Sequence, residues 1–290
     1  MKKIIERLLI FFIGLPAVIG LVLFLPWFNN LVMNLIIVFL SGVGAVEFSS
    51  MLQKKNINIT KTESFIFGAI APLAITLHIS LAIPSWIIPV IIMSGVGWAL
   101  MSGVFSKSSE MENVINKVTG GFSLLVYPGA FMCWIVRMNI WENNYIILLF
   151  LFIIFASDSL AWLFGMLFGK NNRGILAASP NKSMAGFTGG VIGPVIIACC
   201  AAFFIPNIFP GAQTSAVSSI VGKAAVLGLL SGIAAIFGDL AESAIKRSCE
   251  FKDSGKFLLG RGGALDSIDS IAASAPVFYM LFYHLFINVL

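Results

Sequence analysis

The aspartates of this 290-residue chain are unevenly placed, because all five lie in its second half. They are Asp158, Asp239, Asp253, Asp266 and Asp269. Asp158 falls near the middle of a long apolar run, and Asp239 falls near the end of another. A carboxylate in or beside a membrane span is costly unless it is paired or used. Asp158 and Asp239 are therefore candidate functional residues.

A segment rich in charge runs from Asp239 to Asp269, between two expected helix ends. If the helix that carries Asp239 continues beyond the membrane surface, Asp239 shares one face with Glu242, Ser243 and Lys246, because these residues are spaced by three and four positions. Asp266 and Asp269 likewise project from one side of the start of the next helix. The sequence thus predicts that two acidic helix ends flank one loop.

The loop between these helix ends carries a glycine-rich turn, Gly260-Arg261-Gly262-Gly263. Glycine allows the backbone to come close to a ligand, and Arg261 places a cation inside the turn. Phosphoryl-type transfer needs carboxylates that hold a hard divalent ion, cations that neutralise phosphates, and a turn of this kind. We therefore expect the loop to take part in such chemistry.

A second basic segment follows Lys170. The run Ser179-Pro180-Asn181-Lys182-Ser183 is typical of a turn that leads into a helix. Free backbone N–H groups at a helix start, with a lysine nearby, suit a phosphate. This segment is a candidate for phosphate binding if it lies on the same side of the membrane as the acidic loop.

The elements that must position these residues are membrane helices. The chain is 59% hydrophobic and only 11% charged, with a mean hydropathy of +0.99, whereas soluble globular chains carry roughly 25% charged residues. This composition excludes a soluble enzyme, a disordered chain and a disulfide-stapled secreted domain. About 20 apolar residues span a bilayer core, and the sequence predicts an all-α polytopic membrane protein with about nine transmembrane helices. The predicted spans lie at about 8–25, 31–48, 65–83, 86–105, 121–138, 145–169, 185–205, 221–242 and 271–290.

The basic residues indicate which ends of the spans face the cytoplasm. With nine spans, all but two of the 18 Lys and Arg residues fall on one side of the membrane, the exceptions being Arg137 and Lys223. The positive-inside rule then places the N-terminus and the acidic loop on the cytoplasmic face of a multi-pass protein of the cell (inner) membrane. Topology and contact with anionic lipids account for the basic balance, so no nucleic-acid partner is expected.

The second half of the chain resembles the phosphatidate cytidylyltransferase family, also called CDP-diacylglycerol synthases. The family signature joins a Ser-x-x-Lys-Arg run, a Lys-Asp-x-Gly run, a glycine-rich turn and a closing pair of aspartates. The matching positions are Ser243, Lys246, Arg247, Lys252, Asp253, Gly255, Gly260, Gly262, Gly263, Asp266 and Asp269. An upstream stretch also resembles the family, at Asp158, Ala161, Gly165, Gly169, Lys170, Ser179, Pro180, Lys182, Ser183 and Gly186. We therefore expect one integral unit, in which a membrane-spanning half (1–140) lacks site motifs and a second half (141–290) carries them.

This resemblance implies transfer of a cytidylyl group from CTP to phosphatidate, which gives CDP-diacylglycerol and pyrophosphate. It implies Mg²⁺ as cofactor and leaves a second cation open. The implied partners are CTP, phosphatidate and membrane lipids, and the family suggests a homodimer. The lipid phosphate is already an anionic nucleophile, so catalysis would rest on positioning and on neutralisation of charge.

The resemblance also implies a role for each matching residue. Asp239 and Asp266 would hold the metal ion, with Asp269 in or just behind its ligand set. The expected catalytic residues are Ser243, Lys246, Arg247, Asp269 and Asp158, of which Asp158 would line a polar cavity. The expected substrate-binding residues are Lys170, Ser179, Lys182, Ser183, Lys252, Asp253, Arg261, Gly262 and Gly263.

Two alternatives to this function remain open at this point. Arg261 replaces the histidine of the signature and cannot exchange a proton near neutral pH, and Ser267 replaces the arginine between the last two aspartates. The chain is therefore alternatively a CTP-dependent transferase or kinase that acts on another lipid or polyprenol. The other alternative is an ion-coupled membrane transporter that uses Asp158 and Asp239. Transporters often show inverted repeats in both halves, and the lack of aspartate in the first half favours the enzyme.

Overall fold

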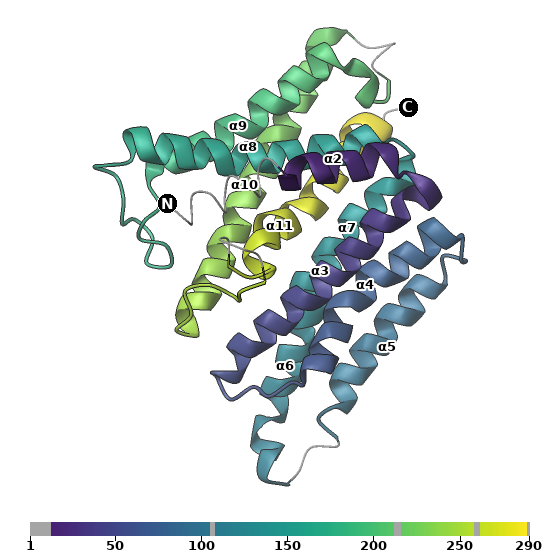
Figure 1. Cartoon of the computed structure of the whole chain (residues 1–290), viewed down its shortest axis with the longest axis vertical. Coiled ribbons are helices and arrows are strands. Elements are labelled where there is room, and N and C mark those ends of the chain that lie inside the picture. The colour runs from purple at the N-terminus through teal and green to yellow at the C-terminus, as the bar shows by residue number, and fades with distance from the viewer. Residues whose placement is uncertain (1–12, 105–107, 212–215, 258–261, 289–290) are drawn as a thin grey trace. The chain divides into compact units, whose positions relative to one another are not determined.

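The computed structural model describes residues 13–104, 108–211, 216–257 and 262–288, and most of these residues are helical (Figure 1). Within these ranges, β-structure is limited to one isolated antiparallel bridge between Arg173 and Ser183. The prediction of an all-α membrane protein is confirmed. The remaining residues, which include Arg261 of the predicted site, lie outside the described ranges.

The first part of the chain contains four helices and one broken helix. The four helices are α2 (Leu15–Phe24), α3 (Trp27–Gln53), α4 (Lys61–Leu81) and α5 (Ile87–Met101). The broken one joins η2 (Ser108–Asn113), α6 (Val114–Leu124), the π-helical η3 (Leu125–Ala130), α7 (Phe131–Arg137) and η4 (Met138–Trp141). The second part contains α8 (Asn144–Phe168), α9 (Met184–Phe204), η5 (Pro206–Ile208), α10 (Val217–Ser248), α11 (Leu265–Phe282) and η6 (Tyr283–Ile287).

Seven helical stretches of the described residues are long and apolar enough to cross a membrane. They are Trp27–Gln53, Lys61–Leu81, Met111–Trp141, Asn144–Phe168, Met184–Phe204, Val217–Ser248 and Leu265–Ile287. The apolar helix α5 is shorter, and α2 coincides with the described part of the first predicted span. Each predicted span therefore overlaps a helix, while the count of nine crossings stays a prediction.

The chain forms two compact units. Residues 1–142 and 246–268 make up the first unit, and residues 143–245 and 269–290 make up the second. The chain passes from one unit to the other after Glu142, inside α10 and inside α11. The candidate residues are thereby divided, because the segment from Lys246 to Ile268 belongs to the first unit, whereas Asp239 and Asp269 belong to the second.

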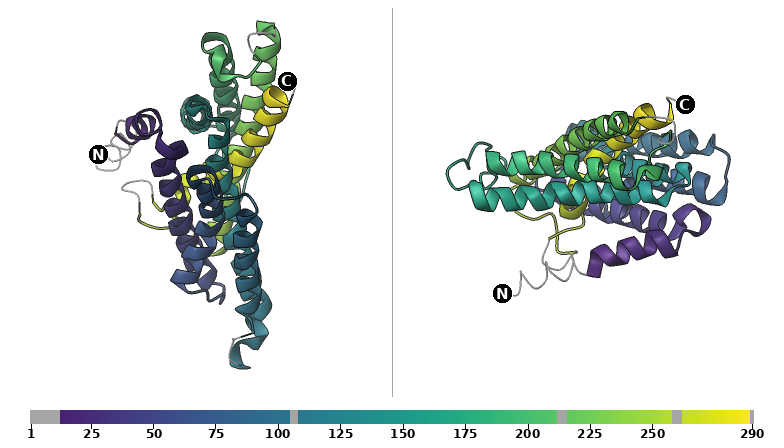
Figure 2. Two further views of the ribbon diagram at one scale, coloured as in Figure 1. Left: turned by 90° about the vertical axis from the view of Figure 1, so that its right-hand side faces the viewer. Right: turned by 90° about the horizontal axis from the view of Figure 1, so that it is seen from above.

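In the first unit, α3 and α4 lie side by side along much of their length (Figures 1 and 2). A Cβ atom on Gly68 of α4 would collide with the Ser41 carbonyl oxygen of α3, so glycine permits this close approach. The Ser41 hydroxyl lies within hydrogen-bond distance of the Gly68 carbonyl, at 2.6 Å, and of the Pro128 carbonyl in η3. Because no water reaches a membrane interior to satisfy such groups, these contacts fix α3 against α4 and η3.

A buried amide cluster joins α3, α4 and η4 near the start of α3. Asn30 Nδ2 donates to Asn139 Oδ1 at 2.8 Å, and Asn139 Nδ2 donates to Asn34 Oδ1 at 2.8 Å. Asn34 Nδ2 in turn donates to Ser80 Oγ at 3.0 Å. The four side chains are at most 6% exposed, so the cluster supplies the partners that buried polar groups require and holds three helical segments together.

In the second unit, α8 and α9 pack against each other, and the view from above shows them side by side (Figure 2, right). Small residues allow this, as at other close helix pairs in membranes. A Cβ atom on Gly189 would collide with the Leu160 carbonyl, and one on Gly193 would lie 2.6 Å from the Ala156 carbonyl oxygen. Several glycines after the predicted phosphate-binding turn therefore serve helix packing.

The α8–α9 contact predicts that alanine substitutions at two glycines of the second unit differ in their effect on stability. We expect Gly193→Ala to lower the free energy of unfolding by about 1–3 kcal/mol, because the added methyl group overpacks the helix contact. Gly222→Ala in α10 is the matched control, since a Cβ atom there meets no atom within 4 Å. Thermal unfolding of the purified variants in detergent measures the difference. A Gly193→Ala protein as stable as the Gly222→Ala protein would contradict this account of the packing.

Candidate active site

The first unit carries the signature loop, which runs from the end of α10 at Ser248 to the start of α11 at Leu265. Its centre is Asp266, whose two carboxylate oxygens are both engaged. Asp266 Oδ1 forms an ion pair with Lys246 Nζ at 2.5 Å. Asp266 Oδ2 accepts hydrogen bonds from the backbone N–H groups of Ser254 (2.8 Å) and Gly263 (2.7 Å). Asp266 therefore binds the loop at Ser254 and at Gly263, and it also binds Lys246 in the last turn of α10.

The predicted glycine-rich turn makes its close approach to these same groups. Gly262 has a φ of +100°, and a Cβ atom there would collide with Asp266 Oδ2. A Cβ atom on Gly263 would collide with Ser254 Oγ and with Glu47 Oε2 of α3. The Ser267 hydroxyl donates to the Gly263 carbonyl at 3.3 Å. Both glycines thus allow the backbone to fold tightly around two carboxylates.

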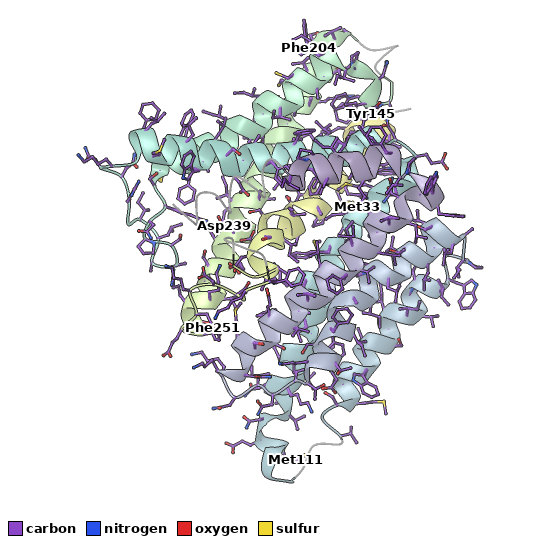
Figure 3. All side chains as sticks on the ribbon, viewed as in Figure 1. Met33, Met111, Tyr145, Phe204, Asp239 and Phe251 are labelled. Carbon is purple, nitrogen blue, oxygen red and sulfur yellow. The ribbon has the colours of Figure 1, made fainter. Side chains whose placement is uncertain are left out.

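The other predicted residues of the loop are open to solvent or to lipid headgroups. Arg247, Lys252 and Asp253 are exposed, and Arg247 Nη1 lies 3.5 Å from the Phe251 carbonyl oxygen. Phe251 follows the end of α10 (Figure 3). The two cations, Arg247 and Lys252, can bind an anion such as a nucleotide phosphate without first breaking a buried contact. Arg261 lies outside the described residues, so its role stays a prediction.

The second unit contributes the segment between α8 and α9. Lys182 Nζ forms an ion pair with Asp239 Oδ2 of α10 at 2.5 Å, and the two side chains are 26% and 37% exposed. Figure 3 labels Asp239 on α10. The Ser183 hydroxyl accepts a hydrogen bond from Gly186 N at 3.0 Å and so caps the start of α9. Lys170 is exposed and Ser179 is half-buried.

The conformation of this segment is fixed by its own backbone. Gly174 N donates to the Pro180 carbonyl at 3.0 Å, and Met184 N donates to the Asn172 carbonyl at 3.1 Å. The Arg173 guanidinium donates to the Gly165 carbonyl of α8 at 3.2 Å. These bonds hold Lys182 beside α10, and they explain how the segment stays ordered between two helices.

Several carboxylates of the second unit lie close together. Asp269 is 7% exposed and Glu242 is 0% exposed, and the carboxyl groups of Asp158, Asp239 and Glu242 are near enough to Asp269 to interact with it electrostatically. A Cβ atom on Gly238 would lie 2.6 Å from the Asp269 carbonyl oxygen, so α10 and α11 approach closely beside this group. Like charges so near one another favour a bound cation.

An apolar groove in the second unit is lined partly by residues of α10 that neighbour Asp239 in the sequence. It has a volume of about 280 Å³ and is lined by Leu176, Phe187, Ile233, Ile236, Phe237 and Leu240. Phe237 and Leu240 flank Asp239 in the sequence. Hydrocarbon and charge therefore lie on adjacent parts of α10, as the binding of an amphipathic molecule requires.

No group of three or more His, Cys, Asp or Glu side chains with the geometry of a metal site is found among residues 13–104, 108–211, 216–257 and 262–288. Asp239 and Asp266, the predicted metal ligands, belong to different units. Each pairs with a lysine, as given above. The assignment of the metal ligands stays a prediction.

Two residues that the sequence reasoning missed stand out. Glu47 accepts a hydrogen bond from Leu265 N at the end of the signature loop. Ser254, inside the loop, has its hydroxyl within hydrogen-bond distance of Glu47 and of the predicted residue Asp266. Ser254 carries no distinctive signal, although it lies inside the signature. Glu47 did carry one, because it is an acidic residue within an otherwise apolar predicted span at 31–48, and such residues are candidates for function.

The comparison with known proteins decides the family. The sequence profile described as the Cytidylyltransferase family matches residues 5–285. The chain belongs to this family. Its membership confirms the resemblance predicted from the motifs, and it shows that the likeness extends over both units.

Several known proteins are similar in sequence to this chain. The phosphatidate cytidylyltransferase of Staphylococcus haemolyticus is 28% identical over 280 residues, which cover 92% of this chain and 96% of that protein. The phosphatidate cytidylyltransferase of Thermotoga maritima is 32% identical over 181 residues, which cover 62% of this chain and 65% of that protein. The uncharacterized protein YnbB of Escherichia coli is 31% identical over 174 residues, which cover 59% of this chain and 54% of YnbB. The match to YnbB thus spans about half of that protein.

The geometry around Asp266 makes a prediction for Gly262. We expect Gly262→Ala to lower the free energy of local opening of the loop by about 1–3 kcal/mol, because alanine is strained at this positive φ and its Cβ atom displaces Asp266. Hydrogen exchange at Ser254 N and Gly263 N would then be about tenfold faster or more. Gly174→Ala is the matched control, since Gly174 has a φ of +79° with no atom within 4 Å of a Cβ atom. Unchanged exchange at both amides in Gly262→Ala would show that Asp266 does not organise the loop.

Proposed function

We propose that this chain transfers a cytidylyl group from CTP to phosphatidate, which leaves CDP-diacylglycerol in the membrane for phospholipid biosynthesis and releases pyrophosphate. One observation carries the proposal: the family profile covers residues 5–285, and a relative named phosphatidate cytidylyltransferase aligns over 92% of the chain. The presence of the signature residues around Asp266, in a loop held by buried contacts, supports it.

The proposed reaction is a displacement at phosphorus. A phosphate oxygen of phosphatidate attacks the α-phosphorus of CTP, and the bond from that phosphorus to the bridging oxygen of the β-phosphate breaks. The electron pair leaves with pyrophosphate. The attacking group is an anion, so the protein has to position two anions and neutralise their repulsion rather than supply a strong base.

Lysines and arginines are the groups that would neutralise this charge. Lys182 and Lys246 each pair with a carboxylate in this structure, and both are proposed to bind phosphate oxygens in the complex. Arg247, Lys170 and Lys252 are exposed and would guide the nucleotide. Ser179 and Ser243, both half-buried, would donate hydrogen bonds to phosphates. Ser183 is already used to cap α9.

Mg²⁺ is the proposed cofactor, with Asp239 and Asp266 as ligands. Carboxylate oxygens are the donors that Mg²⁺ prefers, and when bound the ion would neutralise charge on the transferred phosphoryl group. The chemistry of the donors in the second unit fits, because the carboxyl group of Asp269 interacts electrostatically with those of Asp239 and Glu242. Asp266 could bind the ion through Oδ1 if Lys246, which pairs with this oxygen in the structure, moves to another anion.

The apolar groove beside Asp239 supports a lipid acceptor. Its six lining residues are all apolar. Lys182, which pairs with Asp239, carries the positive charge that would attract a lipid phosphate. We propose that an acyl chain lies in this groove while the lipid phosphate faces Lys182. The site would then open to the cytoplasm, where CTP is found, and the homodimer suggested by the family stays a prediction.

Turnover by the purified chain tests the proposal. We expect radiolabelled CTP, phosphatidate and Mg²⁺ to give lipid-linked CDP, and we expect EDTA to abolish the product. Asp266→Asn would lower the rate roughly 100-fold or more, because it removes a metal ligand and a loop contact. Glu250→Gln is the matched control, since this exposed acid follows α10 in the same unit and takes no part in the proposed site.

Parallel reactions distinguish the alternatives. If a polyprenyl phosphate accepts the cytidylyl group and phosphatidate does not, the acceptor is a polyprenyl phosphate rather than phosphatidate. Phosphorylation of a lipid alcohol by CTP would identify a kinase. A folded chain that neither turns over nor binds CTP would contradict the enzyme and favour an ion-coupled transporter.

A further inference from the structure

Glu47 connects α3, far away in sequence, to the signature loop. It lies in the last third of α3, and its side chain is half-buried. Glu47 Oε1 accepts a hydrogen bond from Ala264 N at 3.0 Å, and Oε2 accepts one from Leu265 N at 2.9 Å. A single carboxylate from α3 thus binds two consecutive backbone amides at the start of α11.

Glu47 also shares a partner with Asp266. The Ser254 hydroxyl lies 2.9 Å from Glu47 Oε2 and 2.9 Å from Asp266 Oδ2, and it accepts a hydrogen bond from Asp266 N at 3.2 Å. The two carboxylates are therefore linked through one serine. A displacement of Glu47 would act directly on Ser254, Leu265 and the backbone of Asp266.

The glycines of the loop give a second, independent observation. A Cβ atom on Gly255 would collide with Glu47 Oε1, and one on Gly263 would collide with Glu47 Oε2. The loop backbone is thus folded around the Glu47 carboxylate on two sides. At these two positions the absence of a side chain accommodates Glu47.

Glu47 lies where the start of a helix offers free hydrogen-bond donors. The N-terminus of a helix carries partial positive charge from its free N–H groups, and an anion there is stabilising. The two amides and the Ser254 hydroxyl supply the donors that a carboxylate in a membrane protein needs. Glu47 therefore caps α11 from outside the helix.

We infer that Glu47 is a positioning residue for the reaction. By holding the start of α11, it sets the place of Asp266 and, through the Asp266 ion pair, of Lys246. Glu47 touches neither of these side chains with its own carboxylate in the contacts described, so it acts through the backbone and Ser254. The consequence for turnover rests on the proposed function, whereas the anchoring of the loop does not.

Glu47→Gln tests this inference with little change of shape. The neutral amide has one acceptor oxygen, and its NH₂ group faces backbone N–H donors, so at least one of the two bonds to the loop is lost. We expect kcat to fall roughly 100-fold, with a smaller change in the KM for CTP. Exchange of Ala264 N and Leu265 N with solvent deuterium would become faster. Glu47→Asp keeps the carboxylate on a shorter side chain, and we expect its kcat and its amide exchange rates to lie between those of Glu47→Gln and of the parent.

Glu63→Gln separates positioning from general stability. Glu63 also caps a helix N-terminus in the first unit, through a capping box with Thr60 at the start of α4. We expect it to lower the unfolding temperature while leaving kcat and the exchange at Ala264 N and Leu265 N near the parent values. If Glu47→Gln lost activity only in proportion to its folded fraction, or kept the parent kcat and exchange, the inference would be overturned.

The two proposals can fail separately. If the parent chain does not use CTP and phosphatidate, the proposed function fails, and faster exchange at Ala264 N and Leu265 N in Glu47→Gln still supports the anchoring of the loop. If the parent is active and exchange and kcat are both unchanged in Glu47→Gln, the inference about Glu47 fails and the proposed function stands.

Discussion

Carboxylates in a membrane protein must find donors inside the protein, and this constraint shapes the candidate active site. Glu47 and Asp266 together accept hydrogen bonds from four backbone N–H groups, those of Ser254, Gly263, Ala264 and Leu265. The loop between α10 and α11 folds tightly because these amides converge on two acids. The neighbouring glycines follow from the same constraint, since side chains at Gly262 and Gly263 would occupy the space of the carboxylate oxygens.

The acidic residues of the second unit are arranged differently. Asp269 Oδ1 accepts a hydrogen bond from Ser270 N at 2.6 Å, and the nearby carboxyl groups of Asp239, Glu242 and Asp158 add charge of the same sign. Lys182 offsets part of this charge through its ion pair with Asp239. A divalent cation carried by a nucleotide would offset more of it, which is the physical reason to assign Asp239 to metal binding.

Much of the fold could be predicted from the sequence, because long apolar runs in a chain with few charges can only be membrane helices. The family resemblance implied that Lys246 and Asp266 belong to one site; the structure shows an ion pair between the two side chains, and their roles in catalysis and metal binding stay predictions. The roles of Gly189 and Gly193 could not be predicted, because helix packing and ligand binding both favour glycine. Glu47 was missed because its partners lie more than 200 residues away, and no local pattern reveals such a contact.

The central proposal is that Asp239 and Asp266 bind a divalent cation for cytidylyl transfer. It is tested most directly by titrating Mn²⁺ into the purified chain while following the electron paramagnetic resonance signal of free Mn²⁺. The account predicts saturable binding that Mg²⁺ reverses, and it predicts affinity that is weaker by roughly tenfold or more in Asp239→Asn. Glu250→Gln should bind as the parent does. Equal Mn²⁺ affinity in the parent and in Asp239→Asn, with both proteins folded, would contradict the account.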